Sequence, residues 1–588
     1  MMKKTMIAAS VAAACTLGPV TSQAVNVSLD STGQALLYPY YNVNNGNTTF
    51  VSVTNTTDQA KAVKVRFREG VGSEDVFDFT LYLSPEDVWV GSLFRDGNNV
   101  KLSTNNDTSC TVPQRSALEA AAFSSARIDS DYQAAAADRA TVVANRLSEG
   151  HIEIIEMAEL PPGAITTAVT HQNGVPADCS VPVTFTGGRL ASGDRVGAIL
   201  DQGSVTSANI TQSFNNPTGG LYGQAAIFNI ASGTYFPYNA TALNQFSANP
   251  IWWPQNAQPF TGVVDVAAGG NALIAGGLDS LGRPIANYRT ADNGTTVPAQ
   301  AGTLNFDLPD LSTPTTAEVA AGARADQYTI DLAGVPAVKT GIFNANGSPN
   351  AKFDKRDAVS ASLVANTLQT DYITSDTFGS DWLITFPTRY LHVSDVSAVA
   401  PFTRTETVQS GQACHDVGFD FWNREEAKNA VDPGVGVSPG LPAPAFTLCF
   451  EVNVLALNNT DSASEALDAI ATKADVPLEF ADGWAQIDLT NAGQHQLTSG
   501  DNVVFNGLPV IGFTAVIDTV TGTERGGVFP SRAKFDVVGQ VNNGGNNNGG
   551  AFDATQFANL DDCLAGAGDD ANNQGACIAT GIVGGFGG

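Results

Sequence analysis

Alternating apolar and polar residues constrain the fold of this chain more than any other feature. In KAVKVRFRE, residues 61–69, apolar side chains alternate with lysines and arginines, and VFDFTLYL at 76–83 continues the alternation. A period of two puts the apolar side chains on one face of a β-strand. Consecutive strands of this kind bury one shared face, so a β-sandwich sheet is the expected product.

A hairpin is expected just before these strands. YPYYNV is followed by the turn signal Asn44-Asn45-Gly46 and then by TTFVSVTN at 48–55. Strand patterns return at HIEIIEM and AAIFNI, and after residue 356 at VSASLVA, WLITFPTRYLHV, LCFEVNVLAL, WAQIDL and LPVIGFTAVID. The sequence therefore predicts a mainly β fold of antiparallel β-sandwich lobes, with an Ala-rich helical excursion and long loops.

Composition shifts along the chain predict its organisation. SALEAAAF begins an Ala-rich helical insertion at about 113–147. A chain of 588 residues exceeds the usual size of one domain, which favours two lobes. We expect a signal peptide at 1–24, an N-terminal β-sandwich lobe at 25–250, a loop-rich connection at 251–355, a second β lobe or completion of the first at 356–540, and a Gly/Asn-rich linker with a disulfide-looped tail at 541–588.

The first 24 residues have the three parts of a secretory signal peptide. Lys3 and Lys4 precede an apolar stretch at 6–17, and Ser22-Gln23-Ala24 forms a small-x-small cleavage site. An alternative is lipidation of Cys15 after Ala12-Ala13-Ala14. Either reading predicts an exported protein, located at the cell surface, in the periplasm or outside the cell.

The acidic balance of the chain argues against several partners. There are 29 basic and 58 acidic residues, for a formal net charge of −29. Such a field repels nucleic acid and anionic lipid head groups, so a nucleic-acid partner is excluded, whereas cations such as calcium are attracted. No second apolar run reaches about 18 residues, so the mature chain is expected to lack a transmembrane helix.

Six cysteines remain after signal cleavage, and an oxidising compartment favours their pairing. Six cysteines allow fifteen pairings. We favour sequential pairing because each pair then encloses a loop-like segment, although zinc binding is an alternative that lacks CxxC or HExxH spacing. The predicted disulfides are Cys110 with Cys179, Cys414 with Cys449, and Cys563 with Cys577.

Calcium is the one metal that the sequence suggests, and no other cofactor is assigned. Clustered hard oxygen ligands stand before a glycine turn in the tail, although they lack the spacing of an EF-hand. A similar Asx-rich composition occurs at 42–47. The weak calcium candidates are Asp569, Asp570, Asn572 and Asn573.

Aromatic and acidic residues suggest weak candidates for carbohydrate recognition, and no catalytic residue is assigned. The adjacent Trp252 and Trp253 form a possible sugar-stacking platform, although neighbouring residues of a strand face opposite ways. Glycoside hydrolases use carboxylate pairs that meet in space without a local motif. The nearest acidic candidates are Glu153, Glu156, Asp381, Glu425 and Glu426.

Six segments spread over about residues 34–520 carry a family resemblance. They are VSVTNTTDQAKAVKVRFREG, FDFTLYLSPEDVW, EGHIEIIEM, GGLYGQAAIFNI, SDWLITFPTRY and LCFEVNVLAL. As a set they resemble large exported proteins of gamma- and deltaproteobacteria that are described as cell-surface or hypothetical proteins. The resemblance implies an exported β-rich surface protein and transfers no site.

We therefore expect an exported, non-enzymatic cell-surface or extracellular structural or adhesive β protein. Its expected partners are further copies of itself, joined through exposed strand edges, and cell-surface components or glycans. The alternative is a secreted carbohydrate-binding protein or glycoside hydrolase. An outer-membrane barrel is disfavoured by the cysteines and the helical excursion.

Overall fold

A computed structural model describes residues 25–538, apart from long gaps at 184–213, 256–308, 312–354 and 431–445 and shorter gaps elsewhere. The predicted signal peptide, most of the predicted connecting region and the whole tail lie outside the described residues. The structure is 52% strand and 13% helix, with several antiparallel sheets. The predicted mainly β class is therefore confirmed.

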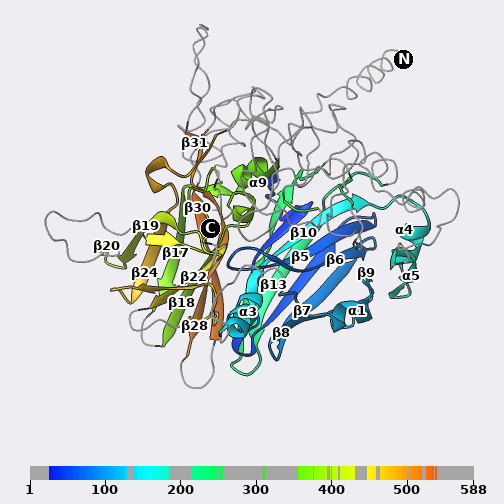
Figure 1. Cartoon of the computed structure of the whole chain (residues 1–588), viewed down its shortest axis with the longest axis horizontal. Coiled ribbons are helices and arrows are strands. Elements are labelled where there is room, and N and C mark those ends of the chain that lie inside the picture. Colours follow the sequence, from blue (N-terminus) through cyan, green and yellow to red (C-terminus); the bar gives the residue numbers. More distant parts are fainter. Residues whose placement is uncertain are drawn as a thin grey trace, which may run out of the picture.

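Two sheets form the first sandwich, on the right of Figure 1. Sheet 1 has the strand order β1 (Asn26–Val27), β15 (Thr241–Asn244), β3 (Ala35–Asn42), β10 (Glu149–Glu159), β5 (Lys61–Glu69), β6 (Asp75–Leu83) and β9 (Cys110–Val112). Sheet 2 has the order β14 (Thr234–Asn239), β13 (Leu221–Asn229), β4 (Thr48–Asn55), β7 (Val88–Asp96) and β8 (Asn99–Ser103), and β2 (Thr32–Gly33) also pairs with β13. Phe79 and Trp89, whose ring centroids are 5.6 Å apart, join the sheets across the core.

Two further sheets form the second sandwich. Sheet 3 has the order β20 (Lys428–Ala430), β19 (His415–Asn423), β24 (Asp482–Asp488), β17 (Thr367–Ile373) and β30 (Arg532–Lys534), and β21 (Phe446–Leu448) also pairs with β19. Sheet 4 has the order β23 (Lys473–Pro477), β22 (Val452–Asn458), β18 (Phe378–Thr385), β28 (Ile511–Asp518) and β29 (Arg525–Pro530). All their strand pairs are antiparallel except β22 with β23, which is parallel.

Small sheets and short helices complete the described structure. The small sheets are β11 (His171–Gln172) with β12 (Val175–Pro176), β16 (Val364–Ala365) with β27 (Leu508–Pro509), and β25 (Gln496–Thr498) with β26 (Val504–Asn506) and β31 (Val537–Val538). The helices are α1 (Arg115–Ala120), α3 (Arg139–Leu147), α4 (Ala164–Val169), α5 (Ser180–Val183) and α9 (Lys355–Leu363), with 3-10 turns η1 (Asn44–Gly46), η4 (Arg389–Leu391) and η5 (Asn491–Gly493). Helices α1 and α3 lie in the Ala-rich segment.

The predicted hairpin around residues 44–46 is wrong. Strand β3 pairs with β10 and β15 in sheet 1, whereas β4 pairs with β7 and β13 in sheet 2. The turn η1, in which Asn45 has a φ of 50° and Gly46 one of 87°, carries the chain from one sheet to the other. The turn residues were recognised correctly, but they bridge two layers and do not join paired strands.

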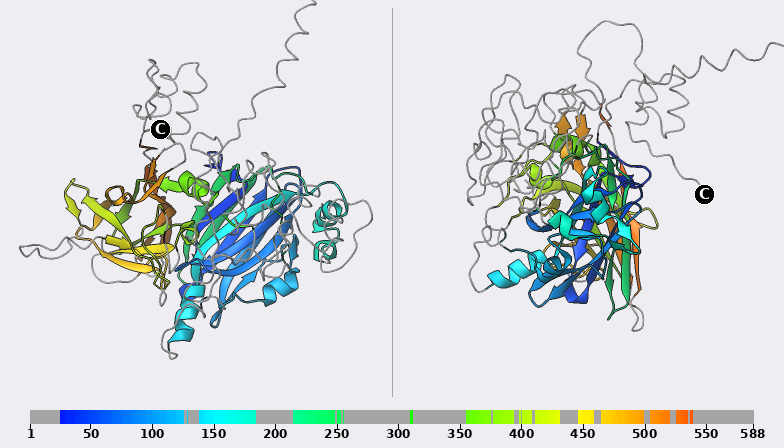
Figure 2. Two further views of the ribbon diagram at one scale, coloured as in Figure 1. Left: turned by 45° about the horizontal axis from the view of Figure 1, so that its top comes forward. Right: turned by 90° about the vertical axis from the view of Figure 1, so that its right-hand side faces the viewer.

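The two sandwiches share a continuous core. The outer face of sheet 4 packs on the first sandwich, where Tyr238 of β14 stacks on Phe513 of β28 with ring centroids 4.8 Å apart. Strand β29 also lies beside β14, and Figure 2 shows the lobes in contact from two further directions. Both faces of sheet 4 are therefore covered, which explains why β18 is almost wholly buried.

Two of the three predicted disulfides are confirmed. Cys110, on β9, is bonded to Cys179 just before α5, and Cys414 is bonded to Cys449 beside sheet 3. The bonds close segments with sequence separations of 69 and 35 residues. Cys563 and Cys577 lie outside the described residues, so their pairing stays a prediction.

Candidate functional site

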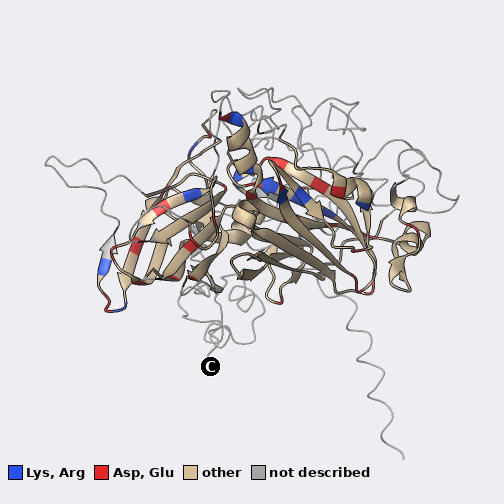
Figure 3. Cartoon of the chain, turned by 90° about the horizontal axis from the view of Figure 1, so that it is seen from below, with Lys and Arg blue, Asp and Glu red and all other residues tan. Residues whose placement is uncertain are grey.

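The charged face of sheet 1 is buried. The alternating sequence of β5 predicted a polar face opposite the apolar one. The four cations on that polar face are nevertheless at most 2% exposed, because other parts of the chain cover them. Each cation pairs with a carboxylate on a neighbouring strand, so blue and red positions lie side by side in Figure 3. The pairs are Lys61 with Glu156 (2.7 Å), Lys64 with Asp78, Arg66 with Asp75 (2.9 Å) and Arg68 with Glu153 (2.8 Å).

Glu153 and Glu156 are structural ion-pair partners and not an accessible catalytic pair. Both are fully buried. Burial alone would raise the pKa of Glu153, but the adjacent Arg68 guanidinium and, to a smaller extent, Arg66 lower it to about 2. Glu156 accepts hydrogen bonds from Lys61 and from the backbone N–H of Gly219 at 2.7 Å. The hypothesis that they hydrolyse a glycoside is therefore not supported by their positions.

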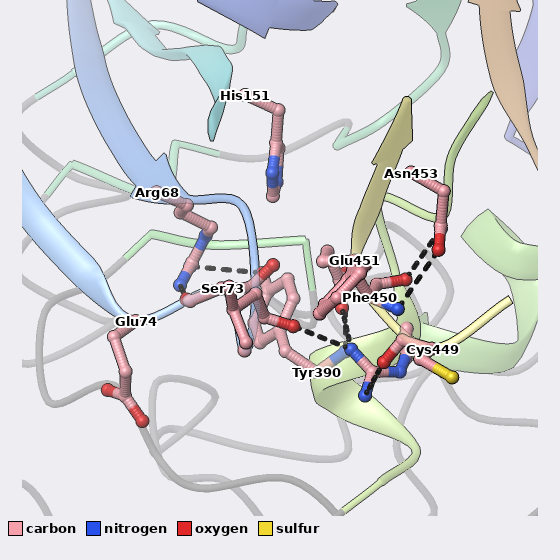
Figure 4. Close-up of polar contacts among 12 residues, drawn as sticks. Arg68, Ser73, Glu74, His151, Tyr390, Cys449, Phe450, Glu451 and Asn453 are labelled. Carbon is pink, nitrogen blue, oxygen red and sulfur yellow. Dashed lines mark hydrogen bonds and ion pairs between the residues drawn. The ribbon is translucent and has the colours of Figure 1, made fainter. Parts of the chain in front are cut away.

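A second cluster of charged and aromatic residues joins the two lobes (Figure 4). Tyr390 of η4 covers the Arg68 guanidinium, whose carbon is 3.9 Å from the ring centroid, and its hydroxyl donates to Glu153 at 3.2 Å. Arg389 donates to the backbone oxygen of Val71 at 3.0 Å and lies 3.3 Å from Glu451. Burial raises the pKa of Glu451 to about 8 in spite of Arg389 beside it.

Two buried carboxylates hold the segment 464–472 between the lobes. Asp381 of β18 accepts hydrogen bonds from the Ser464 hydroxyl at 2.7 Å and from two backbone N–H groups. Glu149 of the first lobe accepts from the Thr472 hydroxyl at 2.6 Å and from the Ala471 N–H at 3.0 Å. These acids satisfy backbone groups in the interior, so they stabilise the lobe contact and are not available to a ligand.

An exposed aromatic site lies on sheet 3. The strand register places Trp422 of β19 directly opposite Trp484 of β24. Their rings stack with centroids 3.9 Å apart and an interplanar angle of 4°, and both side chains are half-buried. Residues 485 and 487 of β24 are buried, whereas 484, 486 and 488 are not, so the tryptophans belong to the outward-facing set.

The tryptophan pair lines an open pocket of about 690 Å³ at the end of the second sandwich. Arg424 forms an ion pair with Asp482 at 3.0 Å on its rim. Lys428 lies 5.3 Å from the Trp422 ring centroid and 2.9 Å from Asp420, so it covers the outer side of the stack. The lining residues are Asp371, Tyr372, Ile373, Trp422, Asn423, Arg424, Glu426, Asp482, Gly483, Trp484 and Phe529.

Of the predicted acidic candidates, Glu426 lines this pocket and Glu425 is exposed beside it, whereas the other predicted site residues that the structure describes lie elsewhere. Trp252 is 1% exposed and stacks on Phe214 at 4.9 Å, because it fills the core on the outer side of sheet 1; Trp253 lies outside the described residues. The calcium candidates Asp569, Asp570, Asn572 and Asn573 also lie outside them. In the 42–47 segment, the Asn42 side-chain amide donates to Leu467 O of the second lobe, and the Asn44 amide donates to Glu149 within the first lobe.

Sequence reasoning missed the Trp422–Trp484 pair. The two residues are 62 positions apart, and only the register between β19 and β24 brings them together. One feature of the sequence could have indicated the pair. In FDFWN and WAQIDL, each tryptophan stands at the positions that alternate with the buried apolar residues, so each is expected on the outward face of its strand. An outward tryptophan in each of two strands is a reason to test whether those strands pair.

Comparison with protein-family models, curated proteins and solved structures finds no match for this chain. Of the helices that the structure describes, none has the length and apolar character needed to cross a membrane. Within the same described ranges, no group of three or more His, Cys, Asp or Glu side chains is placed to hold a metal ion.

Proposed function

We propose that this chain is an exported, non-enzymatic adhesive protein of the cell exterior, and that the outward face of sheet 3 makes the contact. The signal-like first 24 residues support export. Two disulfides support an oxidising compartment. The net charge of −29 suits a soluble exported body and disfavours nucleic acid.

The observation that carries the proposal is the stacked tryptophan pair at an open pocket. Large aromatic side chains that keep solvent-accessible surface are characteristic anchors of recognition sites. Their support is rigid, because strands β17, β19 and β24 are paired along their length and pack on sheet 4. A rigid platform loses little entropy when it binds, which favours recognition.

Fractionation and adhesion measurements test this proposal. We expect the native protein in the outer-surface or extracellular fraction, and the purified chain, residues 25–588, to bind to cells or to isolated envelope material. Trp484→Ala is expected to weaken adhesion, whereas Tyr235→Ala, at a 56% exposed aromatic of the first lobe, is the matched control. A cytoplasmic protein with free thiols, or a chain without affinity for any envelope fraction, would overturn the proposal.

The three carboxylates of the pocket favour a second candidate, a secreted glycoside hydrolase. Asp371, Glu426 and Asp482 line the same pocket as the tryptophans, and glycoside hydrolases work with pairs of such groups. Release of reducing sugar from a polysaccharide panel by the wild-type chain, and its loss in Asp371→Asn or Asp482→Asn, would establish this alternative.

A further inference from the structure

We infer that the sheet 3 pocket binds a neutral oligosaccharide, with one sugar ring stacked on Trp484. This inference rests on the proposed recognition role of the same site and names its ligand class. Sugar rings present apolar C–H faces that pack on aromatic rings, while their hydroxyls need carboxylate, amide or guanidinium partners. The pocket offers both kinds of group within one lining.

The strand register identifies which aromatic face is available. Four residues are paired side by side in one row across sheet 3. They are Lys428 on β20, Trp422 on β19, Trp484 on β24 and Asp371 on β17. Trp422 therefore lies between Lys428 and Trp484. Trp484 has one face against Trp422 and the other turned toward β17, where Asp371 and Ile373 line the pocket.

The spacing on the β17 side suits a stacked ring. Adjacent strands are about 4.8 Å apart, and carbon atoms in contact are about 3.5–4.0 Å apart. Asp371 is exposed at the next strand, so a ring lying on Trp484 brings its hydroxyls toward that carboxylate. Carboxylates bind sugar hydroxyls by charge-assisted hydrogen bonds.

Charge selects a neutral sugar over an acidic one. The lining contains the three carboxylates of Asp371, Glu426 and Asp482 but one guanidinium, that of Arg424. Arg424 is already 3.0 Å from Asp482, so the negative charges of Asp371 and Glu426 dominate the remaining pocket. A uronic acid or sialic acid placed here would meet like charge, which is unfavourable.

The polar face beside the tryptophans extends the site to more than one sugar. One level along the strands, Gln369 of β17 donates to Gln486 of β24 at 2.7 Å, and Asp420 of β19 is opposite Gln486. These side chains belong to the same outward-facing set as the tryptophans. An oligosaccharide laid along the strands thus passes from an aromatic to an amide and carboxylate surface.

Isothermal titration calorimetry of the purified chain, residues 25–588, tests the inference. The probes are the neutral cellotetraose, maltotetraose and chitotetraose and the anionic tetragalacturonate. At least one neutral probe is expected to bind, and more tightly than tetragalacturonate. Trp484→Ala is expected to weaken it about tenfold, from the lost stacking, and Asp371→Ala by a similar factor, from the lost charged hydrogen bond.

Control variants separate binding from folding. Trp484→Phe retains an aromatic face and is expected to recover part of the affinity, whereas Tyr235→Ala leaves it unchanged. Asp371→Asn is expected to reduce the discrimination against tetragalacturonate. Because Asp371 is exposed, its variants test the site even if the Trp484→Ala chain does not fold.

The outcomes distinguish this inference from the proposed function. Envelope adhesion that persists in Trp484→Ala and Asp371→Ala, with no binding of the neutral probes, would overturn the glycan inference and leave an adhesive role standing. Tighter binding of tetragalacturonate than of every neutral probe would also overturn it. Cleavage of a bound probe would support a glycan site and overturn the non-enzymatic function.

Discussion

At the scale of single residues, burial separates the acidic side chains of this chain into two groups. Glu149, Glu153 and Asp381 lie in the interior, where Glu149 and Asp381 accept hydrogen bonds from the protein and Glu153 pairs with Arg68. Asp371 and Glu426 lie at an open pocket. The sequence does not separate these groups, because buried acids such as Glu153 and Asp381 and the pocket acid Asp371 all have an apolar or aromatic neighbour in the chain.

Glu153→Gln is expected to lower the free energy of unfolding by about 3–5 kcal/mol. The substitution leaves the fully buried Arg68 guanidinium without its 2.8 Å counter-charge, and an uncompensated buried charge is costly. Urea unfolding followed by tryptophan fluorescence measures the change. Asp420→Asn breaks a partly exposed pair with Lys428 and is the control, with an expected cost under about 1 kcal/mol.

Asp381→Asn is expected to change how stability depends on pH. Burial raises the pKa of Asp381 from 3.8 to about 7, so the folded chain keeps a proton that the unfolded chain has already lost. This group therefore favours the folded state at low pH, and its contribution decreases as the pH rises from about 4 to 7. Asparagine does not titrate and still accepts hydrogen bonds through its oxygen. The variant should gain stability relative to wild type between pH 5 and pH 8 in urea unfolding, and a constant difference would contradict the assignment.

At the scale of elements, most strands were predictable, although VSASLVA, expected as a strand, lies largely in helix α9, and only its last two residues form β16. The segments KAVKVRFRE and VFDFTLYL correspond to β5 and β6, which pair as antiparallel neighbours. Alternation gave the strand type because side-chain direction is a local property of the backbone. The pairing of β3 with β10, more than a hundred residues apart, depends on contacts that no local pattern contains.

The candidate site was predictable in its chemistry and in one of its residues, Glu426. Aromatic and acidic residues were expected to form any sugar site, but the expected tryptophan, Trp252, fills the core beside Phe214. The tryptophans that line the pocket meet through a strand register fixed by the packing of the inner faces of sheet 3 and sheet 4. Register is a tertiary property, so the sequence alone does not supply it.

The disulfides are expected to stabilise the fold by an amount that grows only with the logarithm of the length of the loop that each one closes. Cys110→Ser with Cys179→Ser, or Cys414→Ser with Cys449→Ser, should each lower the free energy of unfolding by about 4 kcal/mol, since sequence separations of 69 and 35 residues give similar loop entropies. Thermal unfolding of the double variants against the oxidised wild type measures this. Unchanged melting temperatures would show that the unfolded state is not restrained by these bonds.

At the scale of the whole molecule, the lobes act as one body because polar and apolar contacts cross between them. Glu149 reaches the segment 464–472, Arg68 packs under Tyr390, and Tyr238 stacks on Phe513. Gly70 lies at the same contact, where an added Cβ would be 2.7 Å from the Thr472 methyl group. The close approach leaves no room for a larger residue.

Glu149→Ala is expected to uncouple the lobes. It removes the acceptor for Thr472 and for backbone N–H groups of the second lobe, which leaves buried donors unsatisfied at a cost of about 1–3 kcal/mol each. Differential scanning calorimetry should show one transition in the wild type and two in the variant. Glu425→Ala, at an exposed turn of sheet 3, is the control and should retain the single transition.

The shared interior has a consequence for how the polypeptide matures. The cations of β5 are covered in part by Tyr390, which follows them by more than three hundred positions along the chain. An N-terminal half made without the second lobe lacks that cover, so we expect it to remain incompletely folded. Fragments that end before residue 356 should accordingly be recovered as aggregates or degradation products, and expression trials are best designed around the uncut polypeptide.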